Sequence, residues 1–153
     1  MFSVIFPGQG SQVVGMGKEF YDKFDLVKNL FKEADETLNF SLSKLILEGP
    51  KNELDLTINT QPAIFLISYS IFNVIKNEFN INLDNAKYFA GHSLGEYSAL
   101  SSAGYLSFVE TLKILRIRGD AMQNSVPQGM GGMVAVLGSS IEVIEKLLEN
   151  NKH

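Results

Sequence analysis

Hydrophobic and polar positions follow two patterns along this chain, and each pattern predicts a different kind of element. Short runs rich in β-branched and aromatic residues, each ended by glycine, predict strands. Longer segments with apolar residues three or four positions apart predict helices. The expected strands are residues 3–6, 86–91 and 133–138. Because helical segments separate these strands, we expect an α/β fold with a parallel sheet.

Capping signals mark the expected helix ends. A serine followed three residues later by glutamate predicts a capping box, as at Ser107 with Glu110 and at Ser139 with Glu142. Thr60 is the expected N-cap of the long apolar segment, with Pro62 in the first turn. The expected helices cover residues 17–38, 41–48, 60–79, 93–104, 107–123 and 139–151.

Composition narrows the class of protein. The 153 residues are 45% hydrophobic and 20% charged, which is typical of a soluble globular domain. The net charge of −4 does not favour a nucleic-acid partner, and the absence of cysteine excludes disulfides and a thiol nucleophile. The apolar run over residues 62–75 is too short and too polar to span a bilayer, and the N-terminus lacks signal-peptide features. We therefore expect a soluble, cytoplasmic protein without a membrane segment.

One motif carries candidate chemistry. Gly91-His92-Ser93-Leu94-Gly95 fits the nucleophile elbow G-x-S-x-G, and it falls where a strand is expected to pass into a helix. Such a turn exposes the serine hydroxyl at a helix N-terminus, where free N–H groups favour developing negative charge. Ser93 is therefore the candidate nucleophile. A merely structural turn is the alternative.

The glycine-rich loop after the first expected strand, "PGQGSQ" at residues 7–12, is the candidate second half of an oxyanion hole. An elbow takes one backbone donor from the residue after the nucleophile, here Leu94, and the other from a loop after an earlier strand. A phosphate cradle is the alternative. The loop lacks the lysine of a P-loop, and Val13 stands where G-x-G-x-x-G needs its last glycine, so we favour the oxyanion interpretation.

A general base for Ser93 is not evident. Only His92 and His153 are present. His92 is adjacent to Ser93, so the two side chains should point apart, and we expect its ring to hydrogen-bond locally and to shape the elbow. His153 is the last residue and is expected to be frayed.

Four sequence blocks in this order, "FPGQGSQ", "TQPA", "GHSLGEYSAL" and "RGDAMQ", closely resemble the malonyl-CoA:acyl carrier protein transacylase family. The similarity runs from Ile5 to about Gly138. It implies an α/β-hydrolase-like parallel-sheet core with the beginning of an inserted ferredoxin-like subdomain. Residues 1–128 would form the N-terminal part of the acyltransferase domain, and residues 129–153 the first βα unit of the small subdomain.

The resemblance also assigns roles to single residues. It implies that Ser93 accepts the malonyl group as an ester and that the backbones of Gln9 and Leu94 form the oxyanion hole. Arg118 would bind the free malonyl carboxylate, which suits a guanidinium that binds carboxylates in a bidentate way. Gln61 would line the same pocket, although a simple polar residue in the first turn of a helix is the alternative. The neighbouring Arg116 is expected to be solvated.

The family's catalytic histidine lies C-terminal to the residues present here, so the resemblance implies that the chain is an incomplete and inactive fragment. It implies no metal or cofactor, malonyl-CoA and acyl carrier protein as partners, and a monomer. The start of "FPGQGSQ" close to Met1 favours a stand-alone enzyme. A polyketide-type acyltransferase domain, a hydrolase with the same elbow, and an inactive chain that only binds a CoA thioester are the alternatives.

Overall fold

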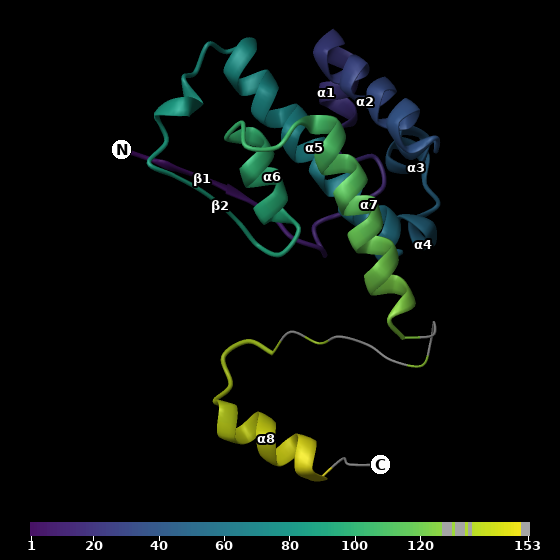
Figure 1. The fold of residues 1–153 in the computed structure, drawn as a ribbon, viewed down its shortest axis with the longest axis vertical. Helices are drawn as coiled ribbons and strands as arrows, with labels where there is room; N and C mark the ends of the chain where they lie inside the picture. The colour runs from purple at the N-terminus through teal and green to yellow at the C-terminus, as the bar shows by residue number, and fades with distance from the viewer. Residues whose placement is uncertain (127–129, 131–133, 135, 151–153) are drawn as a thin grey trace.

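The computed structural model describes residues 1–126, 130, 134 and 136–150. Two strands and several helices form an α/β fold with a small parallel sheet, in agreement with the class expected from the sequence. In chain order, the elements are β1 (Ser3–Phe6), α1 (Lys18–Lys23), α2 (Asp25–Leu38), α3 (Leu42–Glu48), α4 (Lys51–Leu54), α5 (Thr57–Asn77), the 3-10 helix η1 (Leu83–Asn85), β2 (Tyr88–Gly91), α6 (Gly95–Ser102), α7 (Phe108–Asn124) and α8 (Ile141–Asn150) (Figure 1).

The sheet aligns the two loops that carry the candidate chemistry. β1 and β2 pair in parallel, in a register that places Ser3 opposite Tyr88 and Phe6 opposite Gly91. Parallel strands end at the same edge of a sheet, so the loop after β1 and the turn after β2 emerge side by side. The register therefore brings residues 7–12 next to the elbow.

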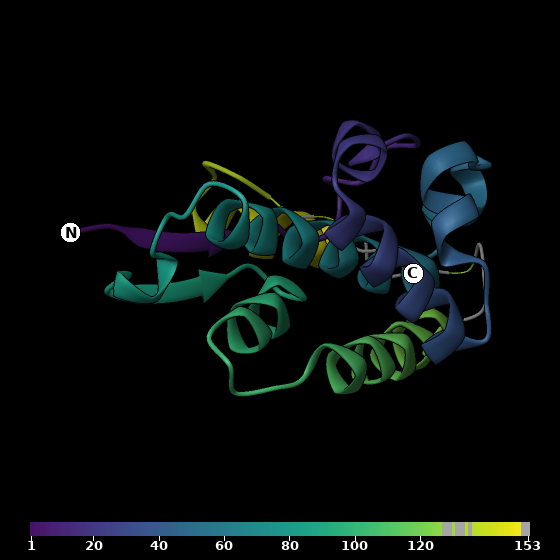
Figure 2. The ribbon, with the colours of Figure 1, turned by 90° about the horizontal axis from the view of Figure 1, so that it is seen from above.

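The helices pack around α5. α5 contacts α7, α2 and α6, and α6 also contacts both strands (Figure 1). The view from above shows α6 and α7 on the same side of α5 (Figure 2). By length and composition alone α5 could cross a membrane, but 61% of its most apolar window is buried inside the protein. α5 is therefore a mostly buried core helix. The buried apolar cluster around it includes Val27, Phe31, Leu42, Ile46, Phe65, Leu112 and Leu115.

The expected single helix over residues 17–38 is wrong, because the segment forms α1 and α2 with a break at Phe24. Phe24 has extended backbone angles, φ −120° and ψ 120°. The break lets its ring contact Phe79, with ring centroids 6.4 Å apart, while Val27 and Phe31 of α2 still face the core. The apolar spacing continues across the break, so periodicity alone could not reveal it.

The start of α5 also differs from the expectation. Thr60 is not the N-cap, since the helix begins at Thr57. The backbone N–H of Thr57 donates to Oε1 of Gln123 on α7 over 3.0 Å, and the Thr60 hydroxyl donates to the Leu54 carbonyl over 2.5 Å. Pro62 consequently lies inside the helix rather than in its first turn. A partner distant in sequence supplies the cap, which local reasoning misses.

Other helix ends follow the sequence signals more closely. α3 ends at Glu48 before Gly49-Pro50, α6 ends close to Gly104, and the Ser107–Glu110 capping box forms at the start of α7. The capping box expected at Ser139 is wrong, because α8 begins at Ile141 and its first-turn glutamate bonds to Ser140 instead.

The strand expected over residues 133–138 lies partly outside the described residues, because Met133 and Ala135 are not among them. The described Val134, Val136 and Leu137 are exposed and belong to no strand. α8 buries none of its described residues. The assignment of residues 129–153 to a small subdomain therefore stays a prediction.

Candidate active site

Ser93 lies in the turn between β2 and α6, and its backbone has a positive φ of 56°. Left-handed backbone at a residue other than glycine is strained, and strain of this kind is typical of a nucleophile elbow. A Cβ on Gly91 would lie 1.9 Å from the carbonyl carbon of Gly95, and a Cβ on Gly95 would lie 2.6 Å from the carbonyl oxygen of Phe6. The G-x-S-x-G spacing is therefore dictated by close backbone approach on both sides of the serine.

The loop after β1 touches the elbow, as the parallel register requires. A Cβ on Gly8 would lie 2.8 Å from the carbonyl oxygen of His92 and 2.4 Å from its Nδ1, so only glycine fits there. Gln9 follows directly, and its side chain donates to the Thr57 hydroxyl over 3.2 Å. The backbone N–H groups of Gln9 and Leu94 donate to no other described residue. Both expected oxyanion donors therefore have no partner among the described residues, and they lie on segments in mutual contact.

The guanidinium of Arg118 lies between Gln61 and Ser93 and contacts both. Arg118 of α7 donates from Nη1 to Oε1 of Gln61 over 2.6 Å and from Nη2 to Oγ of Ser93 over 3.1 Å. Its guanidinium carbon lies 5.8 Å from the centre of the Tyr97 ring. Within the described part of the chain no carboxylate pairs with Arg118. The site therefore presents a fixed positive charge beside the candidate nucleophile.

Close helix packing sets the position of Arg118. A Cβ on Gly119 would lie 2.7 Å from the Cα of Ile58 and 2.7 Å from the carbonyl oxygen of Thr57, so glycine lets α7 approach the start of α5. Gln61 is fully buried there, and its Nε2 donates to Sδ of Met122 over 3.3 Å. A buried amide with both ends bonded is held in one orientation. Gln61 thereby orients the arginine.

Arg116 is not the solvated neighbour expected from the sequence. Its Nη1 donates to Oδ1 of Asn59 over 2.5 Å and to the carbonyl oxygen of Ile58 over 3.3 Å, and its guanidinium stacks on Phe40 at 4.8 Å. The Ile58 carbonyl would normally accept the helical bond of residue 62, but Pro62 has no N–H to give. Arg116 thus satisfies a carbonyl that the proline leaves free. Its partial burial lowers the pKa of Arg116 from its usual value.

No described residue is placed to act as a base for Ser93. His92 is exposed, and its ring lies against Gly8 rather than at the serine hydroxyl. The local hydrogen bond expected for this ring is not formed with any described residue, although packing against Gly8 does shape the elbow. His153 lies outside the described residues.

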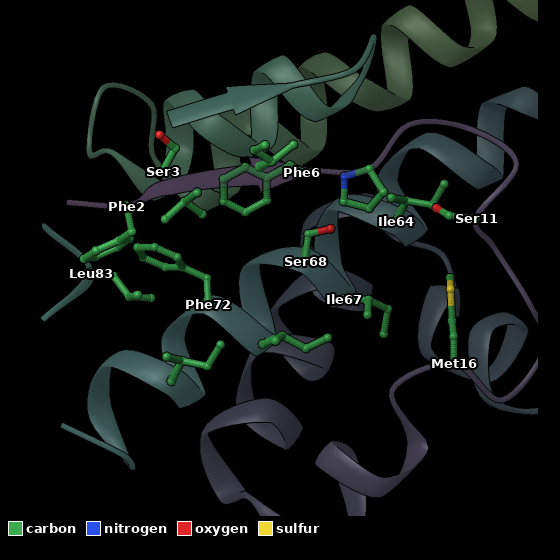
Figure 3. Close-up of a pocket in the computed structure, with 15 residues that line it drawn as sticks. Phe2, Ser3, Phe6, Ser11, Met16, Ile64, Ile67, Ser68, Phe72 and Leu83 are labelled. Atoms are coloured by element: carbon green, nitrogen blue, oxygen red, sulfur yellow. The ribbon is translucent and has the colours of Figure 1, made fainter. Parts of the chain in front are cut away.

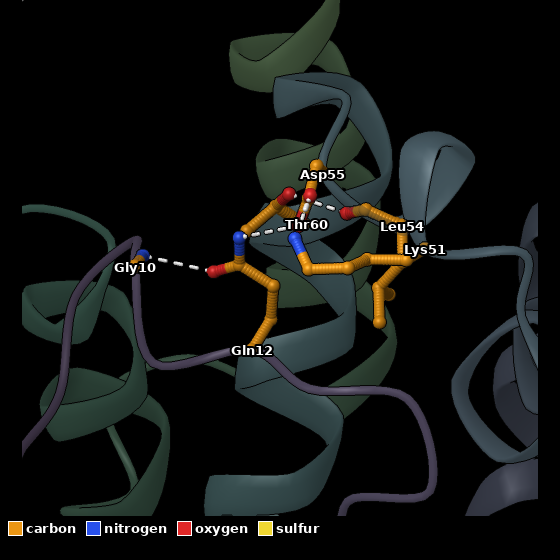
Figure 4. A network of polar contacts seen from close by, with 6 residues as sticks. All are labelled: Gly10, Gln12, Lys51, Leu54, Asp55 and Thr60. Atoms are coloured by element: carbon orange, nitrogen blue, oxygen red, sulfur yellow. Dashed lines mark hydrogen bonds and ion pairs between the residues drawn. The ribbon is translucent and has the colours of Figure 1, made fainter.

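Two residues beside the site were not singled out in the sequence. Gln12 and Asp55 form a network with Gly10 and Lys51 that ties the loop after β1 to the turn between α4 and α5 (Figure 4). The hydrogen bond from the Lys51 ammonium, with a second from the Gln12 amide, holds the pKa of Asp55 below its usual value. Gln12 belongs to the quoted block "FPGQGSQ", so the signal was present but carried no assigned role.

A cavity of about 510 Å³ lies between β1 and α5 and reaches Pro7 and Ser11 of the loop after β1 (Figure 3). Its lining is mostly apolar and includes neither Ser93 nor Arg118; among the lining residues are Phe2, Phe6, Met16, Ile64, Ile67 and Phe72. An apolar groove without the nucleophile does not fit the expected chemistry. Among the described residues, no cluster of three or more potential metal ligands occurs.

Comparison with known proteins identifies the family of this chain. The family model of the acyl transferase domain matches residues 3–149, so the chain belongs to this family. The malonyl CoA-acyl carrier protein transacylase of Bacillus subtilis is 48% identical over 145 residues, which are 95% of this chain and 44% of that protein. The chain therefore spans less than half the length of this curated relative.

Solved structures give the same result. The acyl-carrier-protein-S-malonyltransferase of Bartonella henselae superposes with a TM-score of 0.88 at 42% identity, over 98% of this chain and 48% of that one. A malonyl-transacylase solved in complex with its type II PKS acyl-carrier protein superposes with a TM-score of 0.75 at 40% identity, over 84% of this chain and 40% of that one. The resemblance seen in the sequence is confirmed.

Proposed function

We propose that the protein containing this chain is a malonyl-CoA:acyl carrier protein transacylase of fatty-acid biosynthesis. The observation that carries this proposal is the contact of Arg118 with Ser93 at 3.1 Å, because it sets beside the hydroxyl a guanidinium that pairs with no carboxylate of the described residues. An acyl group with its own free carboxylate, such as malonyl, would supply the missing negative charge. A hydrolase of uncharged esters would have no use for this charge.

The reaction proceeds in two steps. Oγ of Ser93 attacks the thioester carbonyl of malonyl-CoA, the C–S bond breaks, and the CoA thiol leaves with the serine proton. The pantetheine thiol of acyl carrier protein then attacks the serine ester, the bond between the acyl carbon and Oγ breaks, and the thiol proton returns to Ser93 as the malonyl group passes to the carrier. In both steps the backbone N–H groups of Gln9 and Leu94 stabilise the oxyanion, and Arg118 holds the malonyl carboxylate. Gln61 keeps Arg118 in place.

The rest of the proposal follows from the resemblance to the transacylase family. The core is α/β-hydrolase-like, and residues 129–153 begin a ferredoxin-like subdomain. The enzyme acts in the cytoplasm as a monomer and uses no metal or cofactor. A solved relative in complex with its acyl-carrier protein supports a carrier protein as the second partner.

The 153 residues alone are expected to be inactive, because no described residue can take the proton from Ser93. A serine nucleophile without its base keeps the oxyanion hole but loses several orders of magnitude in rate. Purified residues 1–153 should therefore transfer no malonyl group above the buffer background. Turnover near that of a known transacylase would mean that a base is present in this chain.

The test of the function uses the polypeptide encoded by the complete reading frame that contains these residues. Incubation with malonyl-CoA should place a malonyl ester on Ser93, detectable by peptide mass spectrometry, and acyl carrier protein should discharge it. Ser93→Ala should abolish the ester. An undiminished ester in this variant would refute the proposal, and rapid discharge to free malonate instead of the carrier would identify a hydrolase.

A further inference from the structure

The side chain of Gln12 bridges two parts of the site. Its Oε1 accepts the backbone N–H of Gly10 over 2.8 Å, and its Nε2 donates to Oδ1 of Asp55 over 2.9 Å (Figure 4). The other carboxylate oxygen of Asp55 pairs with Lys51, one helical turn away on α4. One amide thus connects the loop after β1 to a carboxylate that is itself fixed.

We propose that Gln12 and Asp55 are positioning residues that hold the backbone N–H of Gln9 in place for catalysis. This inference rests on the function proposed above, in which that N–H is an oxyanion donor. Neither side chain touches the reacting atoms, and both act through the loop.

The loop has little else to hold it at this point. Gly10 has a φ of 105° and nothing within 4 Å of a Cβ built on it, so packing does not fix its backbone. On the other side of Gln9, Gly8 is fixed by its contact with His92 and by the Ser11 hydroxyl, which donates to its carbonyl oxygen over 2.9 Å. The orientation of the Gln9 backbone therefore depends on Gly8 by packing and on Gly10 by the Gln12 hydrogen bond.

The charge of Asp55 explains why residue 12 is glutamine. The side chain must accept a hydrogen bond from Gly10 and at the same time donate one to a carboxylate, which a glutamate cannot do. The turn between α4 and α5 is also bonded to α7. The Thr57 hydroxyl accepts a hydrogen bond from the Gln9 side chain, and the Thr57 N–H donates to Gln123 of α7. The network thus connects the loop to the helix that carries Arg118.

The test exchanges donor and acceptor between the two residues in the complete polypeptide. Gln12→Glu should set two carboxylates against each other, pull the loop from its position and slow malonylation of Ser93 about 10- to 100-fold, because an oxyanion donor acts in the transition state. The dissociation constant for malonyl-CoA should change less than about twofold. Asp55→Asn keeps an acceptor for Gln12 and should slow the reaction less than about threefold.

The double variant Gln12→Glu/Asp55→Asn restores one acceptor and one donor. Its malonylation rate should return to within about threefold of the Asp55→Asn value, whereas independent effects would multiply. Gln12→Met, which removes both hydrogen bonds without adding charge, should also slow malonylation with unchanged affinity. Asp25→Asn is the matched control, since Asp25 forms a similar exposed ion pair with Lys28 away from the loop. Loss of that pair should leave the malonylation rate unchanged.

Three outcomes would overturn the inference: wild-type rates in folded Gln12→Glu and Gln12→Met, loss of malonyl-CoA affinity without loss of rate, or a double variant no better than Gln12→Glu. Thermal unfolding of each variant separates lost fold from lost rate. Absence of any Ser93 ester in the wild-type polypeptide would refute the proposed function itself, so the two failures are distinguishable.

Discussion

The elbow around Ser93 and the loop that faces it both follow a strand of the same sheet, but different forces hold them. Gly91 and Gly95 let backbone segments touch at distances that no Cβ would allow. Close backbone packing, together with backbone hydrogen bonds such as the one from the His92 N–H to the Phe6 carbonyl over 3.2 Å, fixes the elbow. The loop at Gly10 has open space around it and is held by the side chains of Gln9 and Gln12. A turn fixed by close backbone packing should unfold as a whole when that packing is disturbed, whereas a loop held by side-chain hydrogen bonds can shift in small steps.

The largest effect should come from adding one methyl group to the elbow. Gly95→Ala forces a Cβ within 2.6 Å of the Phe6 carbonyl oxygen, and neither backbone can move without breaking the sheet. We expect no cooperative thermal unfolding transition by circular dichroism. Gly104→Ala is the matched control, since its Cβ is strained at a φ of 84° but meets no neighbour within 4 Å. It should lower the free energy of unfolding by only about 1–2 kcal/mol. Similar melting curves for the two variants would contradict steric control of the elbow.

The next effect concerns the arginine held by hydrogen bonds. Arg118→Ala in the complete polypeptide should slow malonyl transfer by two to three decades, about 2–4 kcal/mol, because it removes a bidentate charge-assisted contact. The rate of acetyl transfer should fall far less, since an acetyl group has no free carboxylate for Arg118 to bind. Arg118→Lys should recover only part of the malonyl rate. Equal losses for both acyl groups would mean that Arg118 is structural.

Arg116 should behave in the opposite way, with an effect on stability and none on selectivity. Arg116→Ala leaves the partly buried Ile58 carbonyl without this partner and should cost about 1–3 kcal/mol of unfolding free energy, measured by urea denaturation. Pro62→Ala supplies an N–H that can bond this carbonyl, so in the Pro62→Ala background Arg116→Ala should cost less. A strictly additive double variant would show that Arg116 does not compensate for the proline.

The smallest expected effect is a pH dependence at the loop. Lys51 and Gln12 depress the pKa of Asp55, so its folded pKa lies below the value of about 3.9 usual for the unfolded chain. The stabilisation is therefore complete above about pH 5 and is lost as the pH falls below about 4. Asp55→Asn should be less stable than wild type at neutral pH, and the difference should shrink in acid. If the difference in unfolding free energy between Asp55→Asn and wild type stays constant down to pH 3, the ionised Asp55 carboxylate is not its cause.

Much of this protein could be predicted from its local sequence. The strand at residues 3–6, the glycine patterns of the elbow and of the loop after β1, and the Ser107–Glu110 capping box are visible in residues only a few positions apart. The resemblance to transacylases is confirmed, and the three residues for which it predicts roles, Ser93, Gln61 and Arg118, are joined by hydrogen bonds. Their catalytic roles stay predictions.

Only the tertiary structure decided the rest, because the deciding partners are far apart in sequence. The N-terminus of α5 depends on Gln123, 66 residues away, and Arg116 turns inward because Pro62 on another helix frees a carbonyl for it. The bridge from Gly10 through Gln12 to Asp55 joins segments separated by 43 residues. Local sequence specifies which turns and caps the backbone can form. Which side chain hydrogen-bonds to a given backbone group depends on how the helices and loops pack together. A short stretch of sequence does not determine that packing.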